Sequence, residues 1–150
     1  MKPFVLFLAI SLMGLAPARS ADSQLSQTLY VQLIRGSDDD APPTPQAKSI
    51  GAELDHRLHA VFKWKNYWEI QRQCLALKTG EKLRAPAGPG REVEILLSQD
   101  GEMTVSLYID GKLVRRRRQA ARTRFYITGG DRDGSQSWFI VVRKDKPLNA

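Results

Sequence analysis

The sequence predicts a mostly β protein, an antiparallel β-sandwich or partly open barrel of about seven strands with one short helix. Short runs of alternating apolar and polar residues recur along the chain, and clusters of Gly, Pro and Asp separate them. A single segment carries the three-to-four-residue apolar spacing of a helix. Short strands at close spacing, without alternating helices, favour antiparallel sheets over a parallel α/β architecture.

Length and composition restrict the class further. The 150 residues suit one domain, and 42% hydrophobic with 26% charged residues is ordinary for a globular chain. That balance excludes wholesale disorder and a multi-span membrane protein. Lys and Arg number 23 against 16 Asp and Glu, so the formal net charge is +7. An excess of positive charge favours anionic partners or surfaces.

The first 20 residues are typical of a signal peptide. Lys2 supplies a positive start, and the apolar run at 4–15 is shorter than the ~20 residues that a membrane-spanning helix needs. Small residues follow, which suits cleavage near Ala18, Ser20 or Ala21. The sequence therefore predicts a signal peptide at 1–20, a single β-rich domain at 21–150 and a secreted or periplasmic location. An uncleaved N-terminal anchor or a buried core helix is the alternative.

The N-terminal half of the mature chain is predicted to hold one helix between two strands. Residues 28–35 alternate as a half-buried strand should. The acidic, proline-rich segment at 36–48 is predicted as a surface loop, because proline lacks the donor that a ladder needs. Ser49 is expected to cap a helix whose apolar stripe comprises Ile50, Leu54, Leu58 and Val61. Residues 67–77 form the next predicted strand.

Cys74, the only cysteine, lies in that strand, so no intramolecular disulfide can form. Its apolar neighbours indicate a small buried side chain rather than a nucleophile. An intermolecular disulfide stays open as an alternative.

Five further strands are predicted toward the C-terminus. Residues 91–98 and 103–109 alternate, whereas 79–81 and 85–90 are interpreted as a turn and a loop. Segments 123–128 and 137–143 flank a glycine-rich loop, and the last of them is apolar on both faces, as expected of a central strand. The fifth strand follows residues 103–109 in a hairpin.

That hairpin is the clearest local prediction. Asp110-Gly111 lies between two alternating runs, which indicates a type I′ turn. A two-residue turn would pair Ile109 with Lys112 and Leu107 with Val114.

The most unusual feature of the sequence is the basic segment at 112–124, which contains no acidic residue. Its seven basic residues are Lys112, Arg115, Arg116, Arg117, Arg118, Arg122 and Arg124. A mature chain without Lys2 and Arg19 has 21 basic and 16 acidic residues, hence a net charge of +5. The segment's +7 exceeds that total, so positive charge is concentrated here.

We interpret this segment as an anion-binding site. The planar guanidinium group suits phosphate, sulfate or carboxylate. Strand alternation is expected to place Arg115 and Arg117 on one face and Arg116 and Arg118 on the other. Tyr108 is expected on the face of Arg115, where it could add stacking. In the competing interpretation, the arginines protect an exposed sheet edge or pair with glutamates at positions 92, 94 and 102.

The expected partner is an anionic polymer, an anionic membrane surface or an acidic protein. The chain has no zinc-finger spacing and no RNP-type motif, so sequence-specific nucleic-acid binding is not predicted. The alternative function is that of a protein-interaction subunit of an envelope assembly, with an open strand edge pairing to its partner. The oligomeric state stays open.

An enzyme is the least favoured class. The sequence has no Gly-x-Ser-x-Gly elbow, P-loop or dinucleotide fingerprint. His56 and His59 lie three apart on the predicted helix but away from its apolar stripe, so surface histidines are expected rather than a metal site. The segment at 131–135 lacks the spacing of a calcium loop. No catalytic residue, metal or cofactor is assigned.

Two aromatic runs carry a loose resemblance. Phe62-Lys63-Trp64-Lys65 interleaves rings and cations, either as a buried corner or as a platform at a membrane or carbohydrate surface. The second run is Trp138-Phe139-Ile140-Val141-Val142-Arg143. Together they resemble short exported bacterial proteins of unassigned function. The resemblance would cover most of the mature chain and implies no activity, cofactor or catalytic residue.

Overall fold

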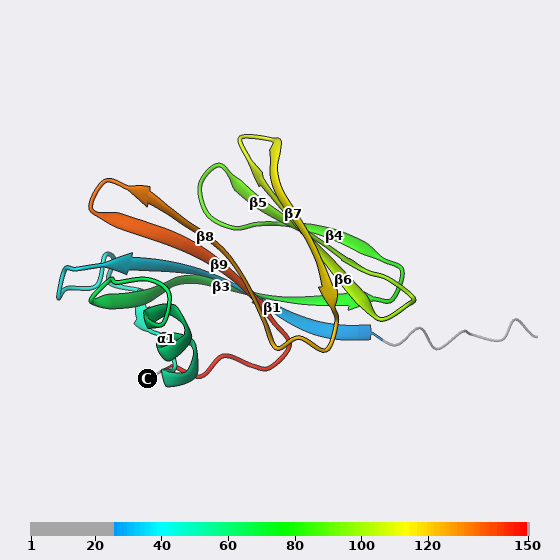
Figure 1. Cartoon of the computed structure of the whole chain (residues 1–150), viewed down its shortest axis with the longest axis horizontal. Coiled ribbons are helices and arrows are strands. Elements are labelled where there is room, and N and C mark those ends of the chain that lie inside the picture. Colours follow the sequence, from blue (N-terminus) through cyan, green and yellow to red (C-terminus); the bar gives the residue numbers. More distant parts are fainter. Residues whose placement is uncertain (1–25, 150) are drawn as a thin grey trace, which may run out of the picture.

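The computed structural model describes residues 26–149, which form nine strands and one helix (Figure 1). The predicted signal peptide at 1–20 lies outside the described residues. The elements are β1 (Ser26–Ser37), β2 (Lys48–Ser49), α1 (Ala52–His59), β3 (Asn66–Lys78), β4 (Lys82–Pro86), β5 (Arg91–Leu97), β6 (Glu102–Ile109), β7 (Lys112–Ala120), β8 (Phe125–Asp133) and β9 (Gln136–Arg143).

The strands form two antiparallel sheets, which confirms the predicted fold class as a β-sandwich. The larger sheet has the order β2-β3-β1-β9-β8, and the smaller sheet has the order β4-β5-β6-β7. The sheets approach each other near the start of β1 and diverge toward the β8–β9 and β6–β7 hairpins (Figure 1). Strand β7 is one edge of the smaller sheet and β8 is one edge of the larger sheet.

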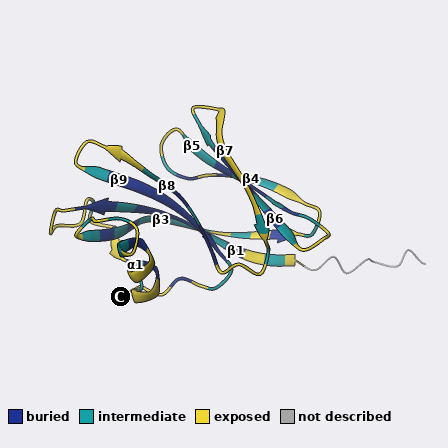
Figure 2. Cartoon of the chain, viewed as in Figure 1, coloured by how far each residue is buried: buried dark blue, intermediate teal, exposed yellow. Residues whose placement is uncertain are grey.

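The main core lies between the two sheets. Alternation along β1 directs Leu29, Val31 and Leu33 inward, against Val93 and Ile95 of β5. All five residues are buried. Strand β9, which pairs with β1, is likewise buried along most of its length (Figure 2). The predicted alternation of 28–35 is therefore confirmed, but the strand is not half-buried throughout, because Gln32 and Ile34 on the other face are also buried, at 2% and 0% exposed.

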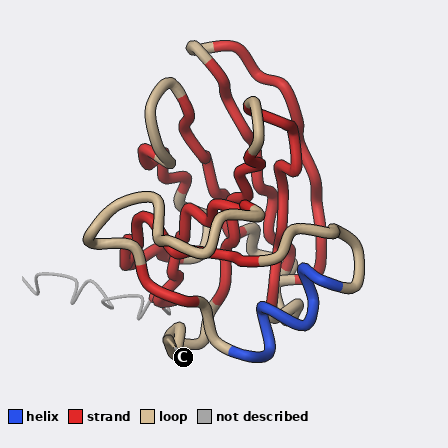
Figure 3. The backbone as a smooth tube through the Cα atoms, turned by 90° about the vertical axis from the view of Figure 1, so that its left-hand side faces the viewer, coloured by secondary structure: helices blue, strands red, loops and turns tan. Residues whose placement is uncertain are grey.

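A second core lies on the other face of the larger sheet, under the helix. Leu54 and Leu58 of α1 pack over Ile34, Tyr67 and Phe139. The helix lies on the side of the larger sheet that faces away from the smaller sheet (Figure 1 and Figure 3). Strand β9 contributes to both cores, which confirms that the last strand is buried on both faces.

Two details of the helix prediction are wrong. Ser49 does not cap the helix, because it lies in β2, and Gly51 takes the N-cap position without a side-chain hydrogen bond. Val61 is 70% exposed, because the helix ends at His59 and the chain has turned away before Val61. Residues Ile50, Leu54 and Leu58 are buried as predicted.

Two strands were not foreseen. Strand β4 was not predicted, and its last two residues lie in the segment 85–90 that is interpreted as a loop from its Gly and Pro content; proline is tolerated at the end of this edge strand. The two-residue strand β2 lies where the end of the loop and the helix cap were predicted, and it pairs with Glu69 and Trp68 of β3. Strand β8 also extends past Thr128 to Asp133 through a register shift at two glycines.

Cys74 is exposed, so the prediction of a buried thiol is wrong. It lies opposite Tyr30 on the helix side of the larger sheet. The helix packs over Ile34, Tyr67 and Phe139 instead, so this end of β3 is left uncovered.

The C-terminal segment is held against the helix side by charged groups. Arg143 is buried and forms an ion pair with Asp145, and this contact holds the pKa of the Asp145 carboxyl below its usual value. Asn149 forms a β-bridge with Ile50. Within residues 26–149, no helix is long and apolar enough to cross a membrane.

Candidate anion-binding surface

The β6–β7 hairpin presents most of the basic segment. Asp110 and Gly111 both have positive φ values, 49° and 76°, which confirms the predicted type I′ turn. Ile109 lies opposite Lys112 as predicted. The next expected pair is wrong, because Leu107 lies opposite Arg115 instead of Val114. An irregularity between Leu107 and Tyr108 adds one residue to β7 at this point.

This extra residue reverses the faces of the arginines. Arg115 and Arg117 lie opposite Leu107 and Val105, so they share the face directed toward the larger sheet. Arg116 and Arg118 lie opposite Ser106 and Thr104, on the outer face of the smaller sheet. The predicted alternation is confirmed, but the assignment of each pair to a face required the bulge to be known.

Tyr108 is consequently not beside Arg115. It shares the outer face with Arg116, and its ring is covered by the guanidinium of Arg84, 3.6 Å from the ring centroid. Its predicted stacking role toward Arg115 is therefore wrong.

Strand β7 is an exposed edge strand. Its side chains from Lys112 to Arg118 are all exposed (Figure 2). In the described part of the chain, β7 pairs with β6 on one side and with no strand on the other. Its free edge and its arginines therefore face solvent together.

On the outer face, one β7 arginine is neutralised by the protein's own carboxylates. Arg118 forms ion pairs with Asp100, at 2.9 Å, and with Glu102. Arg116 instead donates to the Ser106 hydroxyl at 3.0 Å. The competing interpretation thus holds for Arg118 through Glu102.

The other two glutamates considered in that interpretation have different partners. Glu92 pairs with Arg84 at 3.7 Å, and Glu94 lies 3.8 and 3.9 Å from Arg84 and Lys82. These pairs connect β4 and β5 and do not involve β7.

Arg124 lies apart from the β7 arginines. Its guanidinium binds Glu53 of the helix at 2.9 Å and approaches Asp145 at 3.5 Å. Because two carboxylates already surround it, Arg124 serves to join the β7–β8 connection to the helix side.

On the inward face, Arg115 reaches the edge of the larger sheet. Its Nη1 donates to the Thr128 hydroxyl of β8 at 3.2 Å. Burial raises the pKa of the neighbouring Tyr126, and the positive charges of Arg117 and Arg115 act in the opposite direction. Both arginines therefore lie near the β8 residues Tyr126 and Thr128, which carry no negative charge.

Five basic residues of the segment have no ion pair with a carboxylate anywhere in residues 26–149. We call them the β7 basic surface, and they are Lys112, Arg115, Arg116, Arg117 and Arg122. All five are exposed. Of the seven predicted basic site residues, the structure thus leaves five available to a ligand and commits Arg118 and Arg124 to internal pairs.

The sequence patterns do not predict a second set of positive charges, which the structure brings together. Arg91 of β5 covers the ring of Trp138 with its guanidinium, and Arg35 of β1 lies opposite Trp138 on the inward face of the larger sheet. No short-range motif connects them, because they are distant in sequence. The signal available in the sequence is the strand alternation: Arg35 lies two residues after the inward-facing Leu33, and Arg91 lies two residues before the inward-facing Val93.

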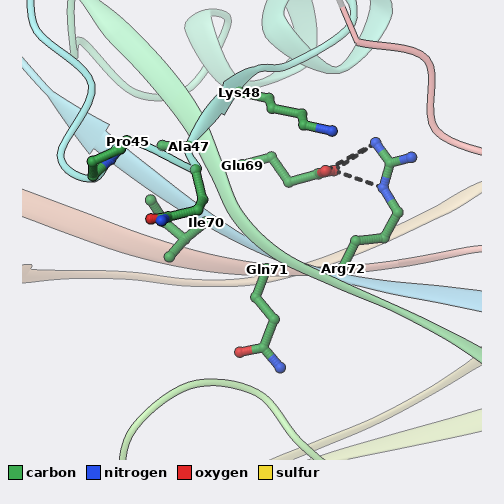
Figure 4. Close-up of a pocket in the computed structure, with 8 residues that line it drawn as sticks. Pro45, Ala47, Lys48, Glu69, Ile70, Gln71 and Arg72 are labelled. Carbon is green, nitrogen blue, oxygen red and sulfur yellow. Dashed lines mark hydrogen bonds and ion pairs between the residues drawn. The ribbon is translucent and has the colours of Figure 1, made fainter.

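A shallow depression beside β3 contains a buried carboxylate that is fully engaged (Figure 4). Glu69 is 6% exposed, accepts from Gln32, and pairs with Arg72 at 2.9 Å. Arg72 also donates to the Pro147 carbonyl and to Asn149, at 3.2 and 2.7 Å. This cluster anchors the C-terminal segment, and the Glu69 carboxylate is fully engaged in it.

The two histidines of the helix have different surroundings. His59 lies 3.1 Å from the Asp55 carboxylate and edge-on to Tyr67, whereas His56 is exposed. In the part of the chain that the structure describes, no cluster of three or more His, Cys, Asp or Glu side chains could hold a metal ion.

The fold and this surface define a class only by architecture, a two-sheet sandwich with a basic edge strand. In comparisons with protein-family models, curated proteins and solved structures, none matches the chain. The function must therefore be argued from the surface itself.

Proposed function

We propose that the protein is an exported, non-enzymatic binding module that recognises an anionic surface or polymer through the β7 basic surface. The observation that carries this proposal is the position of Arg115, Arg116 and Arg117. They lie on an exposed edge strand without a carboxylate partner in the described residues. Three guanidinium groups in succession present donors from both faces of one strand.

The physical basis of the proposed binding is the electrostatic attraction between the unpaired arginines and a polyanion. Exposed guanidinium groups attract polyanions from a distance, and each contact displaces counterions from the polymer. Binding of this kind depends little on the sequence of the bound polymer, and it weakens steeply as the salt concentration increases. The predicted signal peptide supports extracellular or envelope polyanions as the accessible ligands.

The first test compares retention on immobilised heparin. We expect the triple variant Arg115→Ser, Arg116→Ser, Arg117→Ser to elute at markedly lower salt than the wild-type chain, because it loses the three unpaired arginines of β7. Arg118 is kept, because its removal would expose the carboxylates of Asp100 and Glu102.

The matched control removes the same charge elsewhere. Lys63, Lys78 and Lys146 are exposed and lie outside β7, so their replacement by serine lowers the net charge by the same three units. We expect this variant to elute close to wild type. Equal losses in the two triple variants would show that net charge alone governs retention and would contradict the proposal.

The open edge of β7 favours a second candidate function, docking of an acidic protein segment by strand addition. A partner strand would take up the free backbone groups while its carboxylates face the arginines. Co-purification from envelope extracts distinguishes the two. A stoichiometric protein partner, with little affinity for heparin, would favour strand addition over polyanion binding.

A further inference from the structure

A second group of cations lies beside Trp138, a buried residue of the main core between the sheets. Arg35 of β1 is the direct neighbour of Trp138 on β9, on the inward face of the larger sheet. Arg91 reaches the same ring from the smaller sheet, with its guanidinium carbon 4.1 Å from a ring centroid of Trp138. Two like charges from different sheets therefore lie close enough for Arg35 to act on Arg91, whose guanidinium covers the aromatic ring.

Arg91 is poorly satisfied by the protein. Its Nε is buried and has no hydrogen-bond partner among the described residues. Its Nη1 makes one long contact, to the Pro89 carbonyl at 3.4 Å. A buried donor without an acceptor is costly, and the cost is greater for a charged group. The described part of the protein therefore leaves most hydrogen-bond donors of the Arg91 guanidinium unused.

Arg84 provides the contrast within the same sheet. It also covers an aromatic ring, that of Tyr108, but it lies within 4.0 Å of both Glu92 and Glu94. The protein thus neutralises one ring-stacked arginine with carboxylates and leaves the other without such a pair in residues 26–149.

The charged groups around Arg91 in the described residues act on it from a distance and do not form an ion pair with it. Burial and the positive charge of Arg35 lower the pKa of Arg91, whereas Asp133, Asp110 and Asp131 act in the opposite direction. These carboxylates do not bind Arg91 directly. Asp133 lies 3.8 Å from Arg35, whose Nη1 also donates to Gln136 at 2.8 Å.

We propose that Arg91, held at the ring of Trp138, and the neighbouring Arg35 bind one phosphate or sulfate group. The forked guanidinium of Arg91 is oriented by the ring and still has donors to offer, which suits bidentate contact with an oxyanion. The second positive charge, on Arg35, offsets the charge of the anion. This site goes beyond the polymer-binding role of β7, because it requires neither Arg115 nor Arg117.

The test measures the melting temperature of the mature chain in inorganic phosphate and, separately, in sulfate. Ionic strength is held constant with sodium chloride. We expect at least one of the two anions to raise the melting temperature saturably, since a ligand bound to the folded state stabilises it. Arg91→Gln is expected to weaken that binding about tenfold or more, through loss of charge-assisted hydrogen bonds.

Two variants make the result specific. Arg84→Gln removes a ring-stacked arginine of the same sheet and should leave the response to phosphate and sulfate at the wild-type level. The β7 triple variant should also retain it, even if it no longer binds heparin. An undiminished response in Arg91→Gln, or no response of the wild-type chain to either anion, would overturn the proposal. Neither result would bear on heparin binding by β7.

Discussion

Replacing Phe139 by alanine is expected to lower the free energy of unfolding by about 3–5 kcal/mol. Phe139 is 0% exposed and lies on β9, the strand that contributes to both cores. Its ring contacts Phe62 and Tyr67, with centroid separations of 4.6 and 5.9 Å. The helix covers this position, so truncation would leave a cavity between helix and sheet that the rigid central strand cannot close.

Urea unfolding of the mature chain measures this effect through the midpoint and slope of the transition. Leu113→Ala is the control, because Leu113 is a 46% exposed apolar residue of the edge strand β7. We expect its effect to stay within about 0.5 kcal/mol. A Phe139→Ala chain as stable as that control would contradict the placement of the second core.

Replacing Glu69 by alanine is expected to cost about 3 kcal/mol, because it breaks a buried ion pair by removing one partner. The carboxylate lies beneath the C-terminal segment, where it accepts from Gln32 and pairs with Arg72. Without it, Arg72 is left partly buried and uncompensated. Its contacts to Pro147 and Asn149 should weaken as well.

Glu92→Ala is the matched control for that variant. Glu92 also pairs with an arginine, Arg84, but its side chain is 42% exposed. Exposed pairs contribute about 1 kcal/mol or less, so this change should have little effect on urea unfolding. Similar costs for the two glutamates would mean that burial of Glu69 has no energetic role.

Local sequence patterns predicted those parts of the fold that depend on neighbouring residues. Asp110-Gly111 indicates a hairpin because few residues accept two successive positive φ values. The alternation along β1 and the two apolar faces of β9 likewise report their own burial. In contrast, β2 and β4 exist only because β3 and β5 offer edges to pair with, and that information is not local.

The basic surface was predictable in composition and less so in geometry. The seven basic residues of segment 112–124 are visible in the sequence. However, one extra residue in β7 decides which face of the sheet each arginine occupies. The pairing of Arg118 with Asp100 follows from the hairpin, whereas that of Arg124 with Glu53 depends on how the helix packs. Arg35 and Arg91 meet only after the two sheets stack.

The measurement that tests the central proposal most directly is the salt dependence of heparin binding by the mature chain. The logarithm of the association constant, plotted against the logarithm of the salt concentration, should have a steep negative slope in wild type. Serine at positions 115, 116 and 117 should reduce the magnitude of that slope by about three, or about one for each lost contact. A slope unchanged by the triple substitution would show that the β7 arginines do not contact the polyanion.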